Sequence, residues 1–196
     1  MSAPAAVVTR DRRAPMQRKM PLLVVGIVLF IGSELMFFSS LFATYFTLRA
    51  QSSRWTPEDV KVDFVRLFFT LVLLGSSGTM QMAVHRLKQG DLAAFKRWTW
   101  LTWLMGAAFL GAQGHEWATV PFQISTNAYG SVFFTMTGFH GLHVFGGLMV
   151  MLVILGRASA GAYSAENHAG VEVAAYYWHF VDFVWIGLFS TIFIVR

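Results

Sequence analysis

The sequence of 196 residues contains no cysteine and few charged residues. The lack of cysteine excludes disulfide bonds, thiolate metal sites, iron–sulfur clusters held by thiolates, and cysteine nucleophiles. Charged residues make up 13% of the chain, about half of the ~25% that is usual in soluble domains. Hydrophobic residues make up 56%. This composition predicts an integral membrane protein.

Five apolar segments are each long enough for the ~20-residue helix that crosses a bilayer. They predict an all-α, polytopic membrane protein, a bundle of five transmembrane helices in a single domain spanning residues 21–196. A polar, basic tail, residues 1–20, precedes them, and the first segment is too long for the ~7–15-residue core of a cleavable signal peptide. The predicted helices cover about 21–48, 65–84, 98–117, 130–155 and 174–195.

Basic residues are concentrated in the tail and in the loop between the second and third segments. Because Lys and Arg are enriched in cytoplasmic loops, the N-terminus is predicted to be cytoplasmic and the C-terminus outside. The net charge of +5 is therefore interpreted as a topology signal, and no nucleic-acid partner is expected.

The first apolar segment carries one carboxylate, Glu34, near its middle. A charge at this depth is costly, so such residues usually face the interior of a protein and mark functional sites. An isolated carboxyl group in hydrocarbon is expected to be neutral. The alternative interpretation is a hydrogen-bonded packing group without further function.

Further polar residues lie on the fourth and fifth segments at about the same membrane depth. His140 and His143 are three residues apart, and Tyr176, His179, Asp182 and Trp185 also repeat by three, so each set is expected on one helix face. All of these except Trp185 are expected to form a polar core network. Hydrogen-bonded packing is the alternative for each. A haem or metal site at the histidines is a sharper alternative, but this spacing is a weak indication of it, and neither a metal site nor a catalytic residue is predicted.

The end of the third segment holds His115 and Glu116. At this outer position they are expected to contact lipid or to form a solvated helix end.

Helix packing also leaves signals in the sequence, because small residues let helices approach closely in a membrane. Small residues on the third and fourth segments are expected on packing faces, and four phenylalanines of the first segment are expected to face lipid or a partner subunit. The small residues are Ala107, Ala108, Gly111, Ala112, Gly138, Gly141, Gly146 and Gly147, and the phenylalanines are Phe37, Phe38, Phe42 and Phe46.

Five stretches resemble subunit III of the haem-copper terminal oxidases, and the resemblance runs over nearly the whole chain after the tail. They are 33–38, 43–46, 128–134, 137–144 and 176–185. Residues 113–116 extend the resemblance towards actinobacterial cytochrome c oxidases. The chain resembles the five-helix form, which lacks the first two helices of seven-helix members.

The resemblance implies a non-catalytic subunit of a proton-pumping cytochrome c oxidase, with haem and copper held by partner subunits. It implies that the chain stabilises subunit I, supports proton uptake, and holds phospholipid beside the route of oxygen. Glu34 matches the family's membrane-embedded carboxylate, and His140, His143, His179 and Asp182 match its polar core positions. The implied partners are oxidase subunits I and II and membrane phospholipids, with a cytochrome bc complex as a further candidate in a supercomplex.

The resulting hypothesis is that Glu34 is largely protonated and hydrogen-bonded to His143 or His140, tying the first helix to the fourth. The nearest rivals are subunit III of a quinol oxidase and the related accessory protein of nitric oxide reductases. A self-sufficient membrane cytochrome is a rival of another class. A small transporter is a third, although broken helices in paired repeats are not evident.

Overall fold

The computed structural model describes residues 22–52, 55 and 63–195. The predicted basic tail and most of the loop before the second helix lie outside these residues. The described part of the chain is all-α, as predicted, and contains no strand. Its elements are α1 Leu22–Gln51, α2 Phe64–Lys88, α3 Leu92–Thr119, α4 Ala128–Ser159, α5 Ala169–Phe189 and a π-helical turn, η1 Ser190–Ile194.

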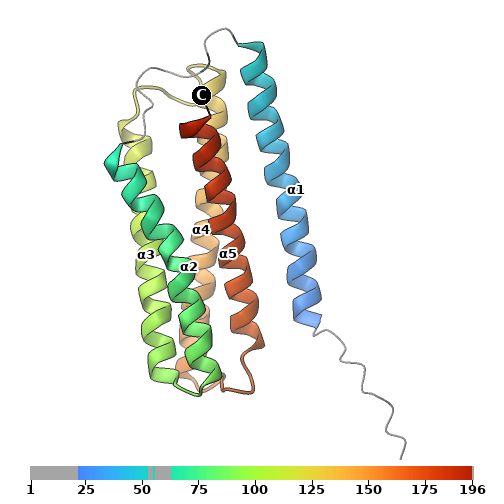
Figure 1. Ribbon diagram of the computed structural model, residues 1–196, viewed down its shortest axis with the longest axis vertical. Helices are drawn as coiled ribbons and strands as arrows, with labels where there is room; N and C mark the ends of the chain where they lie inside the picture. Colours follow the sequence, from blue (N-terminus) through green and yellow to red (C-terminus); the bar gives the residue numbers. More distant parts are fainter. Residues whose placement is uncertain (1–21, 53–54, 56–62, 196) are drawn as a thin grey trace, which may run out of the picture.

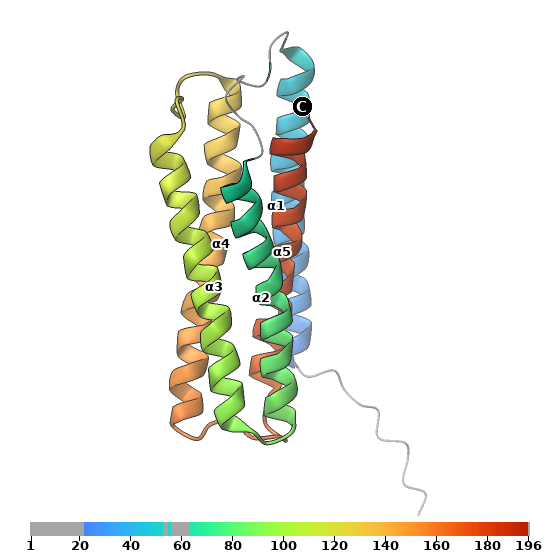
Figure 2. The same cartoon turned by 60° about the vertical axis from the view of Figure 1, so that its left-hand side comes forward.

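The five helices run side by side and alternate in direction (Figures 1 and 2). Helices α2 to α5 pack together, whereas α1 lies to one side and contacts α4 and α5. The start of α1 and the end of the chain therefore lie at opposite ends of the bundle. Which end faces the cytoplasm stays a prediction from the basic residues.

Four helical segments are long and apolar enough to cross a membrane: α1, α2, α4 and the continuous stretch Ala169–Ile194. The remaining helix, α3, has 28 residues and spans about 42 Å, but four tryptophans and the polar residues near its end make it less apolar. Because it runs beside α2 and α4 along the bundle, it completes the five-helix arrangement.

The helices extend beyond the apolar segments, because polar caps continue them outside the hydrophobic stretch. The side chains of Asp63, Asp91 and Asn127 each accept a hydrogen bond from the backbone N–H three residues further on, at the starts of α2, α3 and α4. Such N-caps satisfy amide groups that have no partner within the helix. Between α2 and α3, Gly90 adopts φ 81°, a conformation that permits the tight turn.

The tightest contacts between helices surround Trp178 of α5, which is fully buried. A Cβ atom added at Gly106 of α3 or at Gly147 of α4 would lie 2.7 Å from the indole ring. Gly147 thus lies at a close helix contact, as predicted. The packing face of α3 was predicted wrongly in part, because Gly111 is exposed and has no neighbour within reach of an added Cβ, while Gly106 makes the close contact.

The phenylalanines of α1 correct a second expectation. Phe38 is 2% exposed, and Phe37 and Phe42 are partly buried against the core, so only Phe46 is exposed. The prediction that all four face outward is therefore wrong for three of them. Because apolar residues lie on every side of α1, they do not by themselves reveal which face packs.

Candidate functional site

Glu34 of α1 lies against His143 of α4, and their side chains make a direct contact between the two helices. Glu34 Oε2 is 3.0 Å from His143 Nε2, and the two side chains are 20% and 17% exposed. The contact with the fourth helix that the sequence led us to expect is present, and its partner is His143 rather than His140.

The hydrogen bonds of His143 restrict where protons lie in this pair. His143 Nδ1 is 2.7 Å from the carbonyl oxygen of Phe139, which can only accept, so Nδ1 carries a proton. A neutral His143 then has an acceptor at Nε2, and Glu34 must donate as a carboxylic acid. The other possibility is an imidazolium facing a carboxylate. Either way the pair shares one proton and has no net charge.

Neighbouring side chains fix the position of this pair. The ring of Phe38 packs edge-on against the imidazole, with centroids 5.1 Å apart. Tyr177 of α5 donates a hydrogen bond of 2.9 Å to the backbone carbonyl of His143. Phe30 of α1 in turn lies 6.0 Å from the ring of Tyr177. Three helices therefore meet at His143.

A second polar cluster joins α2 to α5. The hydroxyl of Ser77 is hydrogen-bonded to Asp182 Oδ2, and it also lies 2.9 Å from His179 Nδ1. Asp182 is 3% exposed, and His179 is partly buried. Because one hydroxyl can donate and accept at once, Ser77 links the two ionisable residues of α5 through α2.

Tryptophans of α5 extend this contact along α2. Trp178 Nε1 donates to Ser76 Oγ at 2.8 Å, and Trp185 Nε1 donates to Thr70 Oγ1 at 3.2 Å. Hydrogen bonds from hydroxyl side chains are a usual means of holding helices together in a membrane.

Replacing Ser77 with Ala is expected to lower the thermal stability of the subunit within its complex. The substitution leaves the buried carboxyl group of Asp182 without its hydroxyl partner, at a cost of about 1–3 kcal/mol. The measurement is the unfolding temperature of the purified complex. The matched control is Ser159→Ala, whose hydroxyl bonds only the Leu155 carbonyl of its own helix. Equal unfolding temperatures for both variants would contradict this role of Ser77.

The predicted polar network is divided between separate helix contacts. His140 is fully buried, stacks on Trp185 with ring centroids 4.9 Å apart, and makes no hydrogen bond within the described residues. It belongs to neither of the two clusters above.

Tyr176 does not share the buried face of α5 and is 48% exposed. Three residues turn an α-helix by about 300°, which is about 60° short of a full turn. Residues nine apart, such as Tyr176 and Trp185, therefore differ in direction by about 180° around the helix axis. Tyr176 and Trp185 therefore lie on opposite sides of α5, and placing Tyr176 in the core of this chain was wrong. Its neighbour Tyr177 reaches His143 instead.

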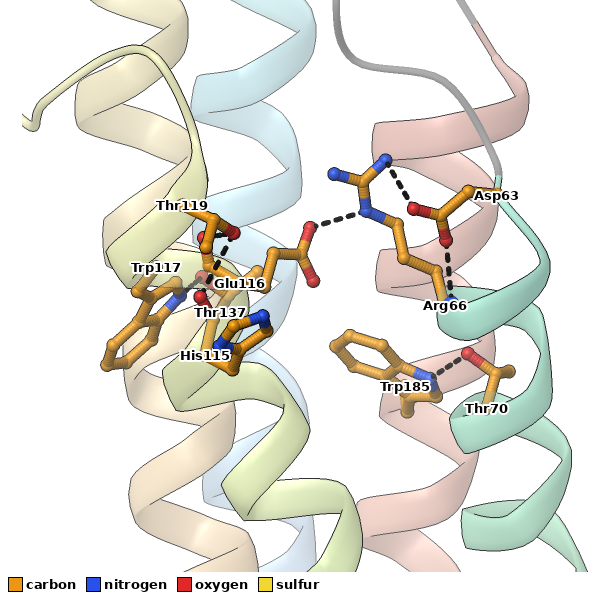
Figure 3. Close-up of polar contacts among 9 residues, drawn as sticks. All are labelled: Asp63, Arg66, Thr70, His115, Glu116, Trp117, Thr119, Thr137 and Trp185. Atoms are coloured by element: carbon orange, nitrogen blue, oxygen red, sulfur yellow. Dashed lines mark hydrogen bonds and ion pairs between the residues drawn. The ribbon is translucent and has the colours of Figure 1, made fainter.

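Glu116, near the C-terminal end of α3, forms a different contact from the one expected. Arg66 of α2 donates through Nε to Glu116 Oε1 at 2.9 Å, and Asp63 lies 3.9 Å from the same guanidinium group (Figure 3). Nearby, Trp117 donates to Thr137 of α4 at 3.1 Å. His115 is exposed. Whether either residue also contacts lipid stays a prediction.

Within the described residues, no three His, Asp or Glu side chains gather as metal ligands would. The histidines of α4 and α5 instead contact Glu34, Ser77 and aromatic rings.

Comparison with known proteins decides the family. The sequence model for cytochrome c oxidase subunit III matches residues 15–195. The chain belongs to this family. "Probable cytochrome c oxidase subunit 3" of Nocardia farcinica is 45% identical over 177 residues, which cover 88% of this chain and 87% of that protein.

Two further relatives show the range of the family. "Cytochrome c oxidase subunit 3" of Thermostichus vulcanus is 41% identical over 88% of this chain and 87% of the relative. The protein of that name from Corynebacterium diphtheriae is 37% identical over 98% of this chain and 99% of the relative. The resemblance to the family, with actinobacterial members included, is confirmed.

Several residues of this subunit III chain that make the helix contacts were not singled out from sequence. They are Thr70, Ser76, Ser77, Arg66 and Tyr177. The adjacent serines of α2 carried a usable signal, because hydroxyl groups within an apolar helix commonly bond to another helix. No sequence signal linked Arg66 to Glu116, since 50 residues separate the two.

Proposed function

We propose that this subunit of aerobic cytochrome c oxidase has no catalytic residue or redox centre of its own. It stabilises subunit I in a bacterial plasma membrane, supports proton uptake, and holds phospholipid beside the oxygen route. The observation that carries this proposal is the Glu34–His143 contact. It places a carboxyl group that shares a proton inside the membrane-spanning part of a subunit whose described residues contain no metal-ligand cluster.

The absence of net charge on the Glu34–His143 pair supports a structural role throughout turnover. A shared proton keeps Glu34 and His143 neutral overall, so the pair can remain within the bundle without a counter-ion. Its hydrogen bond joins α1, the least enclosed helix, to α4. The proposed consequence is that α1 holds a defined position against the rest of the subunit.

An apolar groove between α1 and α4/α5 supports the phospholipid part of the proposal. It has a volume of about 340 Å³ and is lined by Ile27, Phe30, Val150, Val173 and Tyr177, among others. Such a groove suits an acyl chain, which needs apolar contact and no hydrogen bonds. It lies next to Tyr177, which bonds the backbone at His143.

The proposed partners are oxidase subunits I and II, with a cytochrome bc complex as a further candidate. The named relatives favour a cytochrome c oxidase over a quinol oxidase or a nitric oxide reductase accessory protein. Exposed apolar side chains along α1, such as Leu29 and Met36, offer a surface for lipid or for a neighbouring subunit.

The proposal is tested by purifying the native complex through an affinity tag on this chain. We expect chains that carry haem and copper to co-purify, including a subunit II with a copper site. Once separated, this chain should show no haem absorption and no stoichiometric metal by elemental analysis. Haem or copper remaining on the separated chain, or purification of the chain without redox subunits, would contradict the proposal.

A further inference from the structure

A cavity of about 180 Å³ lies between α2, α3 and the end of α5, at the end of the bundle that holds the C-terminus. Its lining combines charged residues at one side with aromatic rings at the other. The lining includes Asp63, Arg66, Gln113, Glu116, Phe109 and Trp185.

The charged side of the cavity is lined by Arg66 and Glu116, which form an ion pair with Arg66 Nε 2.9 Å from Glu116 Oε1 (Figure 3). The two side chains are only 19% and 13% exposed, although they lie near a helix end. Arg66 is further held by Asp63 at 3.9 Å and by the ring of Phe193, whose centroid lies 5.5 Å from the guanidinium carbon. These contacts hold the pair in one position at the edge of the cavity.

One residue of the lining has a side-chain polar atom without a protein partner. Gln113 is 4% exposed, and its Nε2 has no hydrogen-bond partner among the described residues. Buried polar groups in proteins are almost always hydrogen-bonded, to protein or to ordered water. A polar site with room for a molecule of about 30 Å³ is where buried water occurs. The cavity has room for several such molecules.

The charges on the lining select among the candidate occupants. The lining holds two carboxylates, Asp63 and Glu116, against one guanidinium group and the imidazole of His115. Both carboxylates lie within 4 Å of the guanidinium group and offset its charge, so the lining is unfavourable for a phosphate or another anion. The amide N–H groups of Gln113 need an acceptor, which an acyl chain cannot supply. Water meets both requirements.

We propose that this cavity is a gated water site, in which ordered water bonds Gln113 and the Arg66–Glu116 pair controls exchange with the aqueous phase. His140 contacts two aromatic rings of the cavity lining, those of Trp185 and Phe109. Its ring packs against Trp185 and against Phe109 at 5.9 Å, and neither ring nitrogen has a partner among the described residues. The water site thus ends beside the second unpartnered polar side chain of this region.

The test uses Gln113→Cys in the assembled oxidase, because a chain without cysteine gives no background for thiol reagents. Two membrane-impermeant methanethiosulfonates are applied, one carrying a sulfonate and one a quaternary ammonium group. Mass spectrometry of this subunit measures the rate of modification. Ala112→Cys, at a second lining position, repeats the test with a smaller change in volume.

We expect slow modification of Gln113→Cys by both reagents, and modification about tenfold faster or more when Glu116→Ala removes the charge-assisted hydrogen bond. Ser125→Cys, in the exposed loop at the same end, should react rapidly. Thr99→Cys, fully buried and away from the cavity, should not react.

Two results would overturn the proposal. If Glu116→Ala accelerates only the anionic reagent and slows the cationic one, the carboxylate acts through its charge and is not a gate. If both cavity positions stay unreactive with and without Glu116 while Ser125→Cys reacts, the cavity holds lipid or a neighbouring subunit instead of water.

Discussion

Replacing Glu34 with Ala is expected to weaken retention of this subunit and to shorten the catalytic lifetime of the oxidase. The substitution removes the hydrogen bond at 3.0 Å and leaves His143 Nε2 without a partner in a mostly apolar contact. A hydrogen bond to a charged group contributes about 1.5–3 kcal/mol and a neutral one about 0.5–1.5 kcal/mol. The loss corresponds to roughly a 2- to 150-fold shift towards detached α1.

Glu34→Gln distinguishes between the two possible states of the pair, a carboxylic acid facing a neutral imidazole and a carboxylate facing an imidazolium. A glutamine amide can donate to Nε2 as a carboxylic acid does, so subunit retention should stay near wild type if Glu34 is protonated. An amide cannot release a proton, so any proton exchange through this side chain should be lost. Retention is measured by gel filtration of the complex, and lifetime by the number of turnovers before inactivation.

The matched control is Glu166→Gln, which makes the same change at an exposed glutamate in the loop before α5. It should resemble wild type in both measurements. The proposed role of Glu34 fails if Glu34→Gln and Glu34→Ala both leave retention, proton uptake and sustained turnover unaltered.

Gly147→Ala is expected to destabilise the subunit through a steric clash in its best-packed region. The new Cβ would lie 2.7 Å from two carbon atoms of the Trp178 ring. The ring cannot move away easily, because Gly106 contacts it from α3 and its Nε1 bonds Ser76 at 2.8 Å. Overpacking of this kind costs about 1–3 kcal/mol.

Heat-induced release of the subunit from the purified oxidase measures this effect. Gly156→Ala, on the same helix, introduces the same methyl group where no atom lies within 4 Å. We expect this control to be neutral or slightly stabilising, because Ala favours a helix by about 0.5–1 kcal/mol over Gly. Equal release temperatures for the two variants would show that Trp178 is not confined as described.

The helices could be predicted from sequence because membrane spans depend on long apolar runs, which are local. Their ends were less predictable, since caps such as Asp63 and Asp91 extend the helices beyond the apolar segments. The orientation of α1 could be inferred only from Glu34, because apolar residues lie on all sides of the helix. Phe38 and Phe46 look alike in the sequence, yet one is buried and the other exposed.

Glu34 of the candidate site could be predicted from the sequence, but most of the residues that contact the site could not. Glu34 could be singled out because a carboxylate within an apolar run needs a partner, and His143 was one of two candidates for that partner. The spacing of His140 and His143 did not show which helix each side chain contacts. His140 stacks on Trp185 of α5, whereas His143 contacts Glu34 of α1. Helix rotation decides such contacts, and packing against distant segments fixes rotation.

The most direct test of the proposed role compares the oxidase with and without this chain at equal haem content. The subunit is removed by mild detergent and then restored with wild-type protein. Initial turnover should change little, while the number of turnovers before inactivation should fall on removal and recover on addition. A depleted oxidase that lasts as long as the complete one would contradict the account.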